Sequence, residues 1–188
     1  DTKANALLPL PTVLSIIGRV ALALDYAHAQ GVVHRDIKPA NIMYEPASDS
    51  VKVTDFGIAR VTDSSKTKTG LVLGTPSFMS PEQISGKPVD GRSDLYSLAV
   101  MFFQMLTGRL PFEGATLTEL MYKIANADPN SLALFRQDLP ASYEHFMAKA
   151  LAKKANDRYQ TGAEFASALA QLGHNGDDEA NAPDISLV

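Results

Sequence analysis

The 188-residue chain contains no cysteine. Disulfide bridges and cysteine-based metal sites are therefore excluded, and the composition fits a reducing compartment. Long apolar runs are also absent, because even the stretch 98–106 is interrupted by Gln104 and falls short of the ~18 residues that span a bilayer. No signal-peptide pattern opens the chain. We expect a cytoplasmic piece without a membrane span, cut from a longer parent because it begins at Asp1, with an anchor elsewhere in that parent left open.

A strong excess of charge is absent from most of the chain. The net charge of −4 comes from four acids in the segment 173–188, and the other 17 acidic residues balance the 17 lysines and arginines. A neutral body indicates that nucleic acid is not a partner. We predict one domain over 1–172 and an acidic, disordered tail or linker over 173–188.

The apolar pattern predicts a mainly α-helical fold with a few short β-strands. Apolar residues recur at helical spacing over 11–30, and the strongly apolar stretch 93–107 is typical of a buried helix. Further helices are predicted at 116–126, 141–153 and 161–172. Short apolar segments between turn-forming residues predict strands at 32–33, 42–44 and 51–54. The stretch 61–70 shows no periodicity and is predicted to be a mobile loop. Hydrophobic residues make up 45% of the chain, which is ample for a core.

Four short motifs follow one another over about half of the chain. The first runs from His34 to Asn41 and carries Asp36 and Lys38, so that three polar groups can surround one point. Asp-Phe-Gly follows at 55–57, Gly-Thr-Pro at 74–76, and Ser-Pro-Glu at 80–82. An aspartate taken alone is more simply explained as a turn residue. The complete series, in this order and spacing, is typical of protein kinases.

In these motifs the chain resembles the eukaryotic-like (Hanks-type) serine/threonine protein kinases, and the sequence of residues 74–83 resembles that of bacterial members. Segments 93–98, 106–112 and 157–159 extend the resemblance to about 11–172. Lys38, two residues after Asp36, fits serine/threonine rather than tyrosine kinases. The resemblance implies the fold of the large, C-terminal lobe of the kinase catalytic domain.

The resemblance also implies roles in ATP-dependent phosphorylation of protein hydroxyls. Asp36 would be the catalytic base, and Lys38 would neutralise charge on the transferring phosphoryl group. Asn41 and Asp55 would hold Mg²⁺ (or Mn²⁺), which prefers oxygen ligands. Met43 would lie beneath the adenine of ATP.

Other residues would support or regulate this site. The supporting set comprises His34 and Phe56 in a hydrophobic spine, Asp94 holding the catalytic loop through its backbone amides, Thr75 beside the protein substrate, and a buried Glu82–Arg158 ion pair. Arg35 precedes Asp36, as in kinases that are switched by phosphorylation, and Thr67 and Thr69 occupy the places that bacterial relatives commonly phosphorylate. Phosphate there would pair with Arg35.

Two kinase parts do not occur in the sequence. Only Gly18 and Gly31 precede Asp36, so there is no glycine-rich loop, and the only preceding lysine, Lys3, lies in a polar stretch. We therefore expect the N-terminal lobe to be absent and the fragment to be inactive by itself. The cleft face that this lobe would cover should be exposed and apolar, which favours self-association.

Three functions compete on the sequence. An active kinase is favoured because a pseudokinase or protein-interaction scaffold needs none of Asp36, Lys38, Asn41 and Asp55. A small-molecule phosphotransferase is disfavoured because the long segment between Asp55 and Glu82 is typical of a peptide-docking platform. The scaffold is kept as the alternative.

Overall fold

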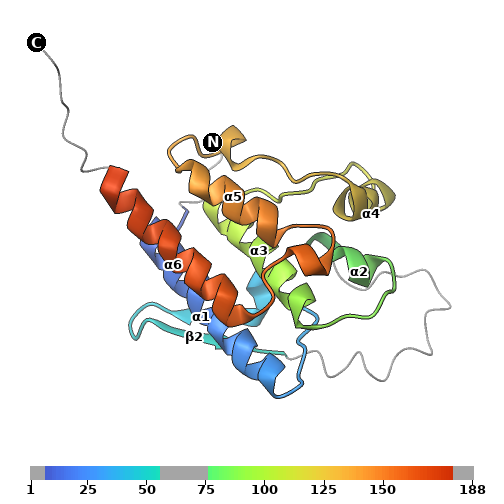
Figure 1. Cartoon of the computed structure of the whole chain (residues 1–188), viewed down its shortest axis with the longest axis horizontal. Coiled ribbons are helices and arrows are strands. Elements are labelled where there is room, and N and C mark those ends of the chain that lie inside the picture. Colours follow the sequence, from blue (N-terminus) through green and yellow to red (C-terminus); the bar gives the residue numbers. More distant parts are fainter. Residues whose placement is uncertain (1–6, 56–75, 180–188) are drawn as a thin grey trace, which may run out of the picture.

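The computed structural model of the chain describes residues 7–55 and 76–179, with side chains up to residue 173. Within these ranges the chain forms a helical body with one two-stranded sheet. The helices are α1 (Leu10–Ala29), α2 (Pro81–Ile84), α3 (Gly91–Thr107), α4 (Leu117–Asn126), α5 (Ala141–Ala150) and α6 (Gly162–Glu179). Short 3₁₀ turns lie at Pro39–Asn41, Pro76–Phe78, Leu132–Leu134 and Ala155–Asp157. The predicted fold class, mainly α with a few short strands, is confirmed (Figure 1).

Helix α3 forms the centre of the core. All side chains from 95 to 103 are buried, which explains why this helix lacks the polar stripe of a surface helix. Asp90 caps its start by accepting a hydrogen bond from the backbone N–H of Arg92 at 3.0 Å. Gly108 ends it with a positive φ of 70°, a conformation in which a side chain would be strained.

Helix α6 packs along α1, and the two lie side by side in Figure 1. Gly162 permits the approach, because a Cβ at this position would overlap the carbonyl oxygen of Ala21. Asp25 of α1 accepts a hydrogen bond at 3.1 Å from the backbone N–H of Ala163, so one helix satisfies a donor at the start of the other. Buried Leu169 and Leu172 continue the contact surface along α6.

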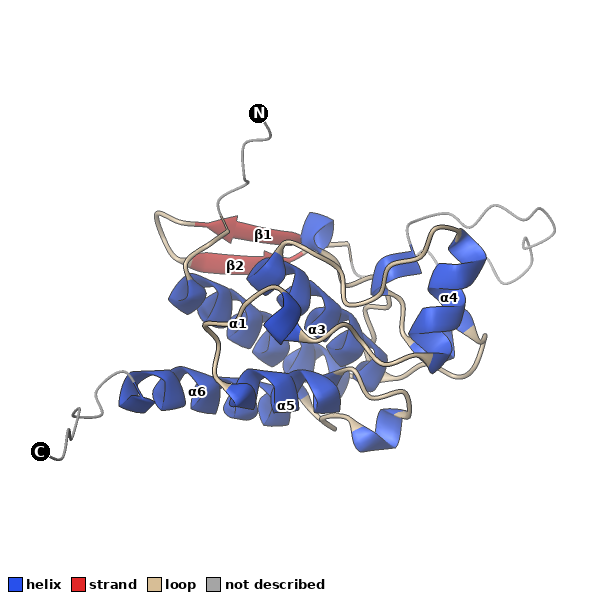
Figure 2. Ribbon diagram, turned by 90° about the horizontal axis from the view of Figure 1, so that it is seen from above, coloured by secondary structure: helices blue, strands red, loops and turns tan. Residues whose placement is uncertain are grey.

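The strands β1 (Ile42–Glu45) and β2 (Ser50–Val53) form an antiparallel hairpin. Its register pairs Ile42 with Val53 at one end and Glu45 with Ser50 at the other. Arg19 of α1 bonds Asp49 in the hairpin turn. Figure 2 shows the hairpin along one side of α1 and α6 along the opposite side. The hairpin is therefore held against the helical body at its turn.

Three predicted elements differ in the structure. Residues Val32 and Val33 are loop and not strand, and α5 ends at Ala150 and not at Lys153. Helix α6 continues past Leu172 to Glu179, so the tail expected from Gly173 begins inside this helix. Packing of α6 along α1 outweighs the low helix propensity of the two glycines in this extension, Gly173 and Gly176. The loop expected at 61–70 lies outside the described residues.

Helix α1 is long and apolar enough to cross a membrane by length and composition, which corrects the expectation that no stretch is. The same test is passed by core helices of soluble proteins. Seven of its side chains are buried, and the helix contacts α3, α6 and β2. We interpret α1 as a core helix for this reason.

Candidate active site

The hairpin brings Asn41 and Asp55 to the same end of the sheet. Asn41 closes the 3₁₀ turn before β1, and its carbonyl accepts a hydrogen bond at 2.9 Å from the backbone N–H of Thr54. Asp55 follows directly after Thr54 and is exposed. Its φ of 55° lies in the left-handed region, which is uncommon for a residue other than glycine. Strained residues of this kind concentrate at functional sites.

Asp36, Lys38 and Asn41 meet around one carboxylate. The Lys38 ammonium donates to Oδ2 of Asp36 at 2.8 Å, and the Asn41 amide donates to the same oxygen at 3.2 Å. The Asn41 amide also donates to the Asp36 carbonyl at 2.7 Å. Asn41 is buried, whereas the Asp36 and Lys38 side chains are 39% and 34% exposed. The three polar groups therefore surround one point that solvent can reach.

His34 lies in the core beneath this loop. Its ring is fully buried, and Nε2 lies 2.8 Å from the carbonyl oxygen of Thr54. The backbone N–H of Asp36 donates to Nδ1 at 3.2 Å, so Nδ1 is the acceptor and Nε2 carries the proton. The ring thus joins Asp36 to Thr54, the residue before Asp55.

Asp94 of α3 holds the loop from the other side. Its carboxylate is buried and accepts from the backbone N–H of His34 at 2.8 Å and of Arg35 at 2.7 Å. These are the backbone contacts expected of Asp94. His28 of α1 adds a contact at 2.8 Å that sequence reasoning missed, and no pattern around His28 signals it. Arg35 has a φ of 67°, which is a strained conformation for a residue other than glycine. The hydrogen bond from its N–H to Asp94 helps to hold this conformation.

The segment 80–84 contacts the loop through Gln83, which sequence reasoning also missed. Ser80 and Gln83 form a capping box at the start of α2, and the Gln83 amide also donates to the Arg35 carbonyl at 2.9 Å. The Ser-x-x-Gln spacing was the available signal for the cap. The contact with Arg35 had no signal, because its acceptor is a backbone carbonyl.

Glu82 and Arg158 form a largely buried ion pair with two parallel hydrogen bonds. Nη1 and Nη2 of Arg158 donate to the two carboxylate oxygens at 2.7 and 2.8 Å. The remaining guanidinium donors are satisfied by the carbonyl oxygens of Ala152, Arg92 and Lys153. The guanidinium also lies 4.8 Å from the ring centroid of Tyr96. The pair links α2 to the turn before α6.

Burial of Glu82 by itself favours the neutral acid. Hydrogen bonds from Arg158 and Ser93 and the charge of Arg158 outweigh this, and they lower its pKa to about 2. Ser93 donates to the carboxylate at 2.5 Å, a contact that sequence reasoning missed. Because its pKa is lowered in this way, Glu82 is ionised at neutral pH. Burial raises the pKa of the nearby Tyr96 hydroxyl above its ordinary value.

The remaining expected residues fall into two groups. Met43 on β1 is 61% exposed, and Val32 beside the loop is 41% exposed. Phe56, Thr67, Thr69 and Thr75 lie outside the described residues.

Among the described residues no group of three or more His, Asp or Glu side chains is placed to hold a metal ion. The expected cation ligands are only two, Asn41 and Asp55. Nδ2 of Asn41 donates to Asp36, so its Oδ1 is the atom uncommitted by that contact, and this donor set fits Mg²⁺.

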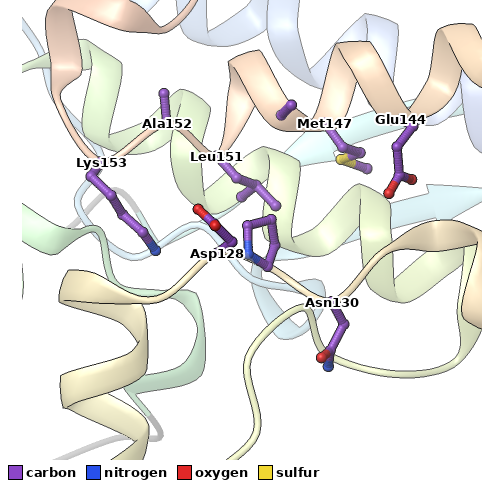
Figure 3. Close-up of a pocket in the computed structure, with 9 residues that line it drawn as sticks. Asp128, Asn130, Glu144, Met147, Leu151, Ala152 and Lys153 are labelled. Atoms are coloured by element: carbon purple, nitrogen blue, oxygen red, sulfur yellow. The ribbon is translucent and has the colours of Figure 1, made fainter.

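A pocket of about 250 Å³ lies elsewhere, between α5 and the segment after α4 (Figure 3). Asp128, Glu144 and Lys153 line it together with apolar side chains, and it contains none of the expected site residues. Lys153 donates to the carbonyl of Ile124 at 2.8 Å near the end of α4. Burial lowers the pKa of its ammonium to about 8. This lysine has a structural use, as a partner for the last carbonyls of a helix.

Comparison with known proteins gives consistent matches. Residues 2–170 match the family described as the protein kinase domain. The serine/threonine-protein kinase PknB of Mycobacterium tuberculosis is 42% identical over 167 residues, which are 87% of this chain and 26% of that protein. Pkn1 of Myxococcus xanthus is 44% identical over 164 residues, 84% of this chain and 23% of that protein. The chain therefore spans about a quarter of the length of these relatives.

Solved structures agree in fold. The kinase domain of Mycobacterium tuberculosis PknI superposes with a TM-score of 0.68 at 34% identity, covering 90% of this chain and 58% of that one. Rad53 residues 1–466 in complex with AMP-PNP gives a TM-score of 0.71 at 26% identity, covering 87% of this chain and 40% of that one. Both comparisons place nearly the whole chain within part of a larger structure.

Proposed function

The chain belongs to the protein kinase domain family, and from this premise we propose that it carries the catalytic and metal-binding half of a serine/threonine protein kinase. The reaction is the transfer of the γ-phosphoryl group of ATP to a protein hydroxyl. Residues 1–172 are assigned to the large lobe, and residues 173–188 to an acidic tail or linker. The use of ATP as the phosphoryl donor agrees with the cytoplasmic location that we expect for this chain.

The observation that carries the proposal is the geometry around the Asp36 carboxylate. It lies on a loop held by Asp94 and His34, with Lys38 and Asn41 in contact. Asp36 accepts the proton of the substrate hydroxyl and orients the hydroxyl oxygen toward the γ-phosphorus of ATP. Lys38 exchanges its contact with Asp36 for the transferring phosphoryl oxygens. A fixed loop that carries exposed reacting groups suits a reaction that depends on positioning and charge stabilisation.

Asn41 and Asp55 would hold the divalent cation, Mg²⁺ or Mn²⁺, through their side-chain oxygens. When bound, the cation neutralises charge on the β- and γ-phosphates. Their position at one end of the hairpin supports this assignment, and the left-handed backbone of Asp55 adds to it. Met43 is exposed on β1 and would contact the adenine.

The 188-residue chain by itself should bind Mg·ATP weakly and turn over negligibly. It contains neither a glycine-rich loop before Asp36 nor a lysine in a strand context there. Titration calorimetry on this chain should give a dissociation constant in the millimolar range or weaker, above ~1 mM. Micromolar binding would contradict this part of the proposal.

Regulation is assigned to Arg35 together with Thr67 and Thr69. Phosphate on either threonine would pair with the guanidinium of Arg35. The backbone of Arg35 is already held by Asp94 and Gln83. The Thr67→Ala/Thr69→Ala double variant should lose most of the activity and phosphate content of the longest natural chain carrying these residues. Unchanged activity and phosphate content would remove this assignment.

The exposed apolar side chains Val32 and Met43 support self-association through the cleft face. Light scattering on the 188-residue chain should show dimers at high concentration, and Met43→Lys should reduce them. A monomer at all concentrations would contradict the prediction.

The deciding experiment is phosphate incorporation by intact mass. The longest natural chain carrying these residues is incubated with Mg·ATP beside its Asp36→Asn form. Incorporation should disappear in Asp36→Asn and persist in Asp138→Asn, which neutralises an exposed acid between α4 and α5. No incorporation by the natural sequence, with added protein substrates also unmodified, would favour the alternative of a pseudokinase scaffold.

A further inference from the structure

The peptide unit that joins Arg35 to Asp36 is held at both of its ends. Its carbonyl oxygen accepts a hydrogen bond from Nε2 of Gln83 at 2.9 Å. Its N–H donates to Nδ1 of His34 at 3.2 Å. The preceding N–H, that of Arg35, donates to Asp94 at 2.7 Å. Three side chains from different parts of the chain therefore set the orientation of the backbone that carries Asp36.

This backbone needs such support. Arg35 has a φ of 67°, and a residue other than glycine persists in that region only when its surroundings hold it there. Asp94 holds the first peptide unit of Arg35 and Gln83 holds the second. Loss of either contact would leave the chain freer to relax toward an ordinary φ, and this rotation would turn the Asp36 side chain.

Gln83 is suited to this contact because its amide is committed at both ends. Oε1 accepts from the backbone N–H of Ser80 at 2.9 Å, while Nε2 donates to the Arg35 carbonyl. A carboxylate of the same length could accept from Ser80 but could not donate to a carbonyl. The structure thus requires an amide, and not merely a capping residue, at this position.

Gln83 also connects the loop to the body of the molecule. It follows Glu82, whose carboxylate is bound by the buried guanidinium of Arg158. Helix α2 is therefore anchored at Glu82, and the next side chain extends to the catalytic loop. A shift of α2 relative to the body would reach the Arg35–Asp36 peptide through this single amide.

We propose that Gln83 is a positioning residue that orients Asp36 and couples the placement of the segment 76–84 to catalysis. This inference rests on the proposed function of Asp36. The segment 76–84 ends the stretch between Asp55 and Glu82 in which the regulatory threonines lie. A displacement of the segment 76–84 would thereby reach Asp36 through the contact of Gln83 with the Arg35 carbonyl.

The catalytic test compares Gln83→Glu with Ser80→Ala in the longest natural chain carrying these residues. Gln83→Glu keeps an acceptor for the Ser80 N–H but loses the donor to Arg35. Ser80→Ala removes the hydroxyl that accepts from the Gln83 N–H and leaves the contact with Arg35 intact. We expect Gln83→Glu to lower kcat about 10- to 100-fold with the KM for Mg·ATP unchanged, because a small misplacement of a catalytic group costs that much. Ser80→Ala should keep kcat within about twofold.

A kcat for Gln83→Glu within about twofold of the natural sequence would overturn the proposal. If Gln83→Glu fails to fold, Gln83→Met takes its place, since it has similar length and places no charge against the Arg35 carbonyl. It must show the same loss of kcat with an unchanged KM. Equal losses in Gln83→Met and Ser80→Ala would also overturn the proposal, because they would indicate a general effect of the cap.

A second measurement needs no turnover. Hydrogen exchange of the Asp36 amide, followed by NMR in the 188-residue chain, should become about tenfold faster in Gln83→Glu and stay unchanged in Ser80→Ala. Equal exchange rates of the Asp36 amide in the two variants would contradict the proposal that Gln83 holds this peptide unit. If the natural sequence transfers no phosphate, the proposed function fails, and the exchange result still decides whether Gln83 holds this peptide.

Discussion

Two acid–base pairs in this molecule have the same chemistry and opposite surroundings. Asp36 and Lys38 are 39% and 34% exposed and share one contact of 2.8 Å. Glu82 and Arg158 are 13% and 1% exposed and share two parallel contacts. An exposed pair contributes little to stability and can exchange partners, whereas a buried pair leaves a costly uncompensated charge if one member is removed. The first pair suits a reacting site and the second suits a brace.

Removal of the buried cation should have the largest effect on stability. Arg158→Met leaves the Glu82 carboxylate in a largely buried site without its counter-charge, and we expect a loss of about 3–5 kcal/mol in the free energy of unfolding. Urea denaturation of the 188-residue chain measures this. The exposed Arg109→Met is the control and should change stability by less than about 0.5 kcal/mol. A loss below about 1 kcal/mol for Arg158→Met would end the distinction between the two pairs.

Asp94 holds the loop that carries the exposed pair, and its substitution should have the next largest effect. In Asp94→Asn one carboxylate oxygen becomes an amide donor, so at least one of the N–H groups of His34 and Arg35 loses its acceptor. A buried donor left unsatisfied costs about 1–3 kcal/mol.

Asp90→Asn provides the matched control for Asp94→Asn. It neutralises an acid at the start of the same helix and keeps a good N-cap residue. We expect it to change the free energy of unfolding by less than about 0.5 kcal/mol. Equal losses in the two variants would show that the helix end, and not the catalytic loop, depends on Asp94.

Acid should weaken the buried pair over a defined range of pH. The pKa of Glu82 falls from an ordinary 4.5 to about 2, so the ionised pair contributes fully above 4.5. This contribution is lost as the pH falls from 4.5 toward 2, because the unfolded chain binds the proton first. The stability difference between the natural sequence and Glu82→Gln should therefore shrink between about pH 5 and about pH 3. A difference that stays constant over this range would contradict the assigned pKa.

The exposed pair should have the smallest effect on stability. Lys38→Ala should change the free energy of unfolding by less than about 1 kcal/mol, as should Lys149→Ala, which removes a comparably exposed partner of Glu164. Only Lys38→Ala should reduce phosphoryl transfer in the longest natural chain, by about 100-fold or more. Similar activity of the two variants would remove Lys38 from the proposed site.

Much of the helical architecture could be predicted from periodicity, because a helix that packs on one side repeats its apolar residues. The start and end of α1 and α3 agree with the prediction to within two residues, and Gly108 ends α3 as expected. The pattern was less informative where packing competes with propensity. Helix α6 passes Gly173 because it packs along α1, and Val32 and Val33 form no strand although both favour one.

The candidate site was predictable in its members and not in its connections. Asp36, Lys38, Asn41 and Asp94 were expected. The structure brings the first three together, and Asp94 holds the backbone N–H groups of His34 and Arg35 just before them. The left-handed φ of Arg35 was not expected, since no residue type announces it. The contacts of His28, Ser93 and Gln83 were missed because each joins segments that are distant in the sequence.

By itself the sequence determined which side chains exist for chemistry, in what order they occur and where the strongly periodic helices lie. These are properties of residue types and short-range spacing, which a linear chain carries directly. Only the tertiary structure decided how Arg158 is satisfied and how the Arg35–Asp36 peptide is held. Backbone carbonyls accept from Arg158 and Gln83, and backbone N–H groups donate to Asp94 and His34. Because almost every residue carries these backbone groups, the fold alone selects which of them meet a given side chain.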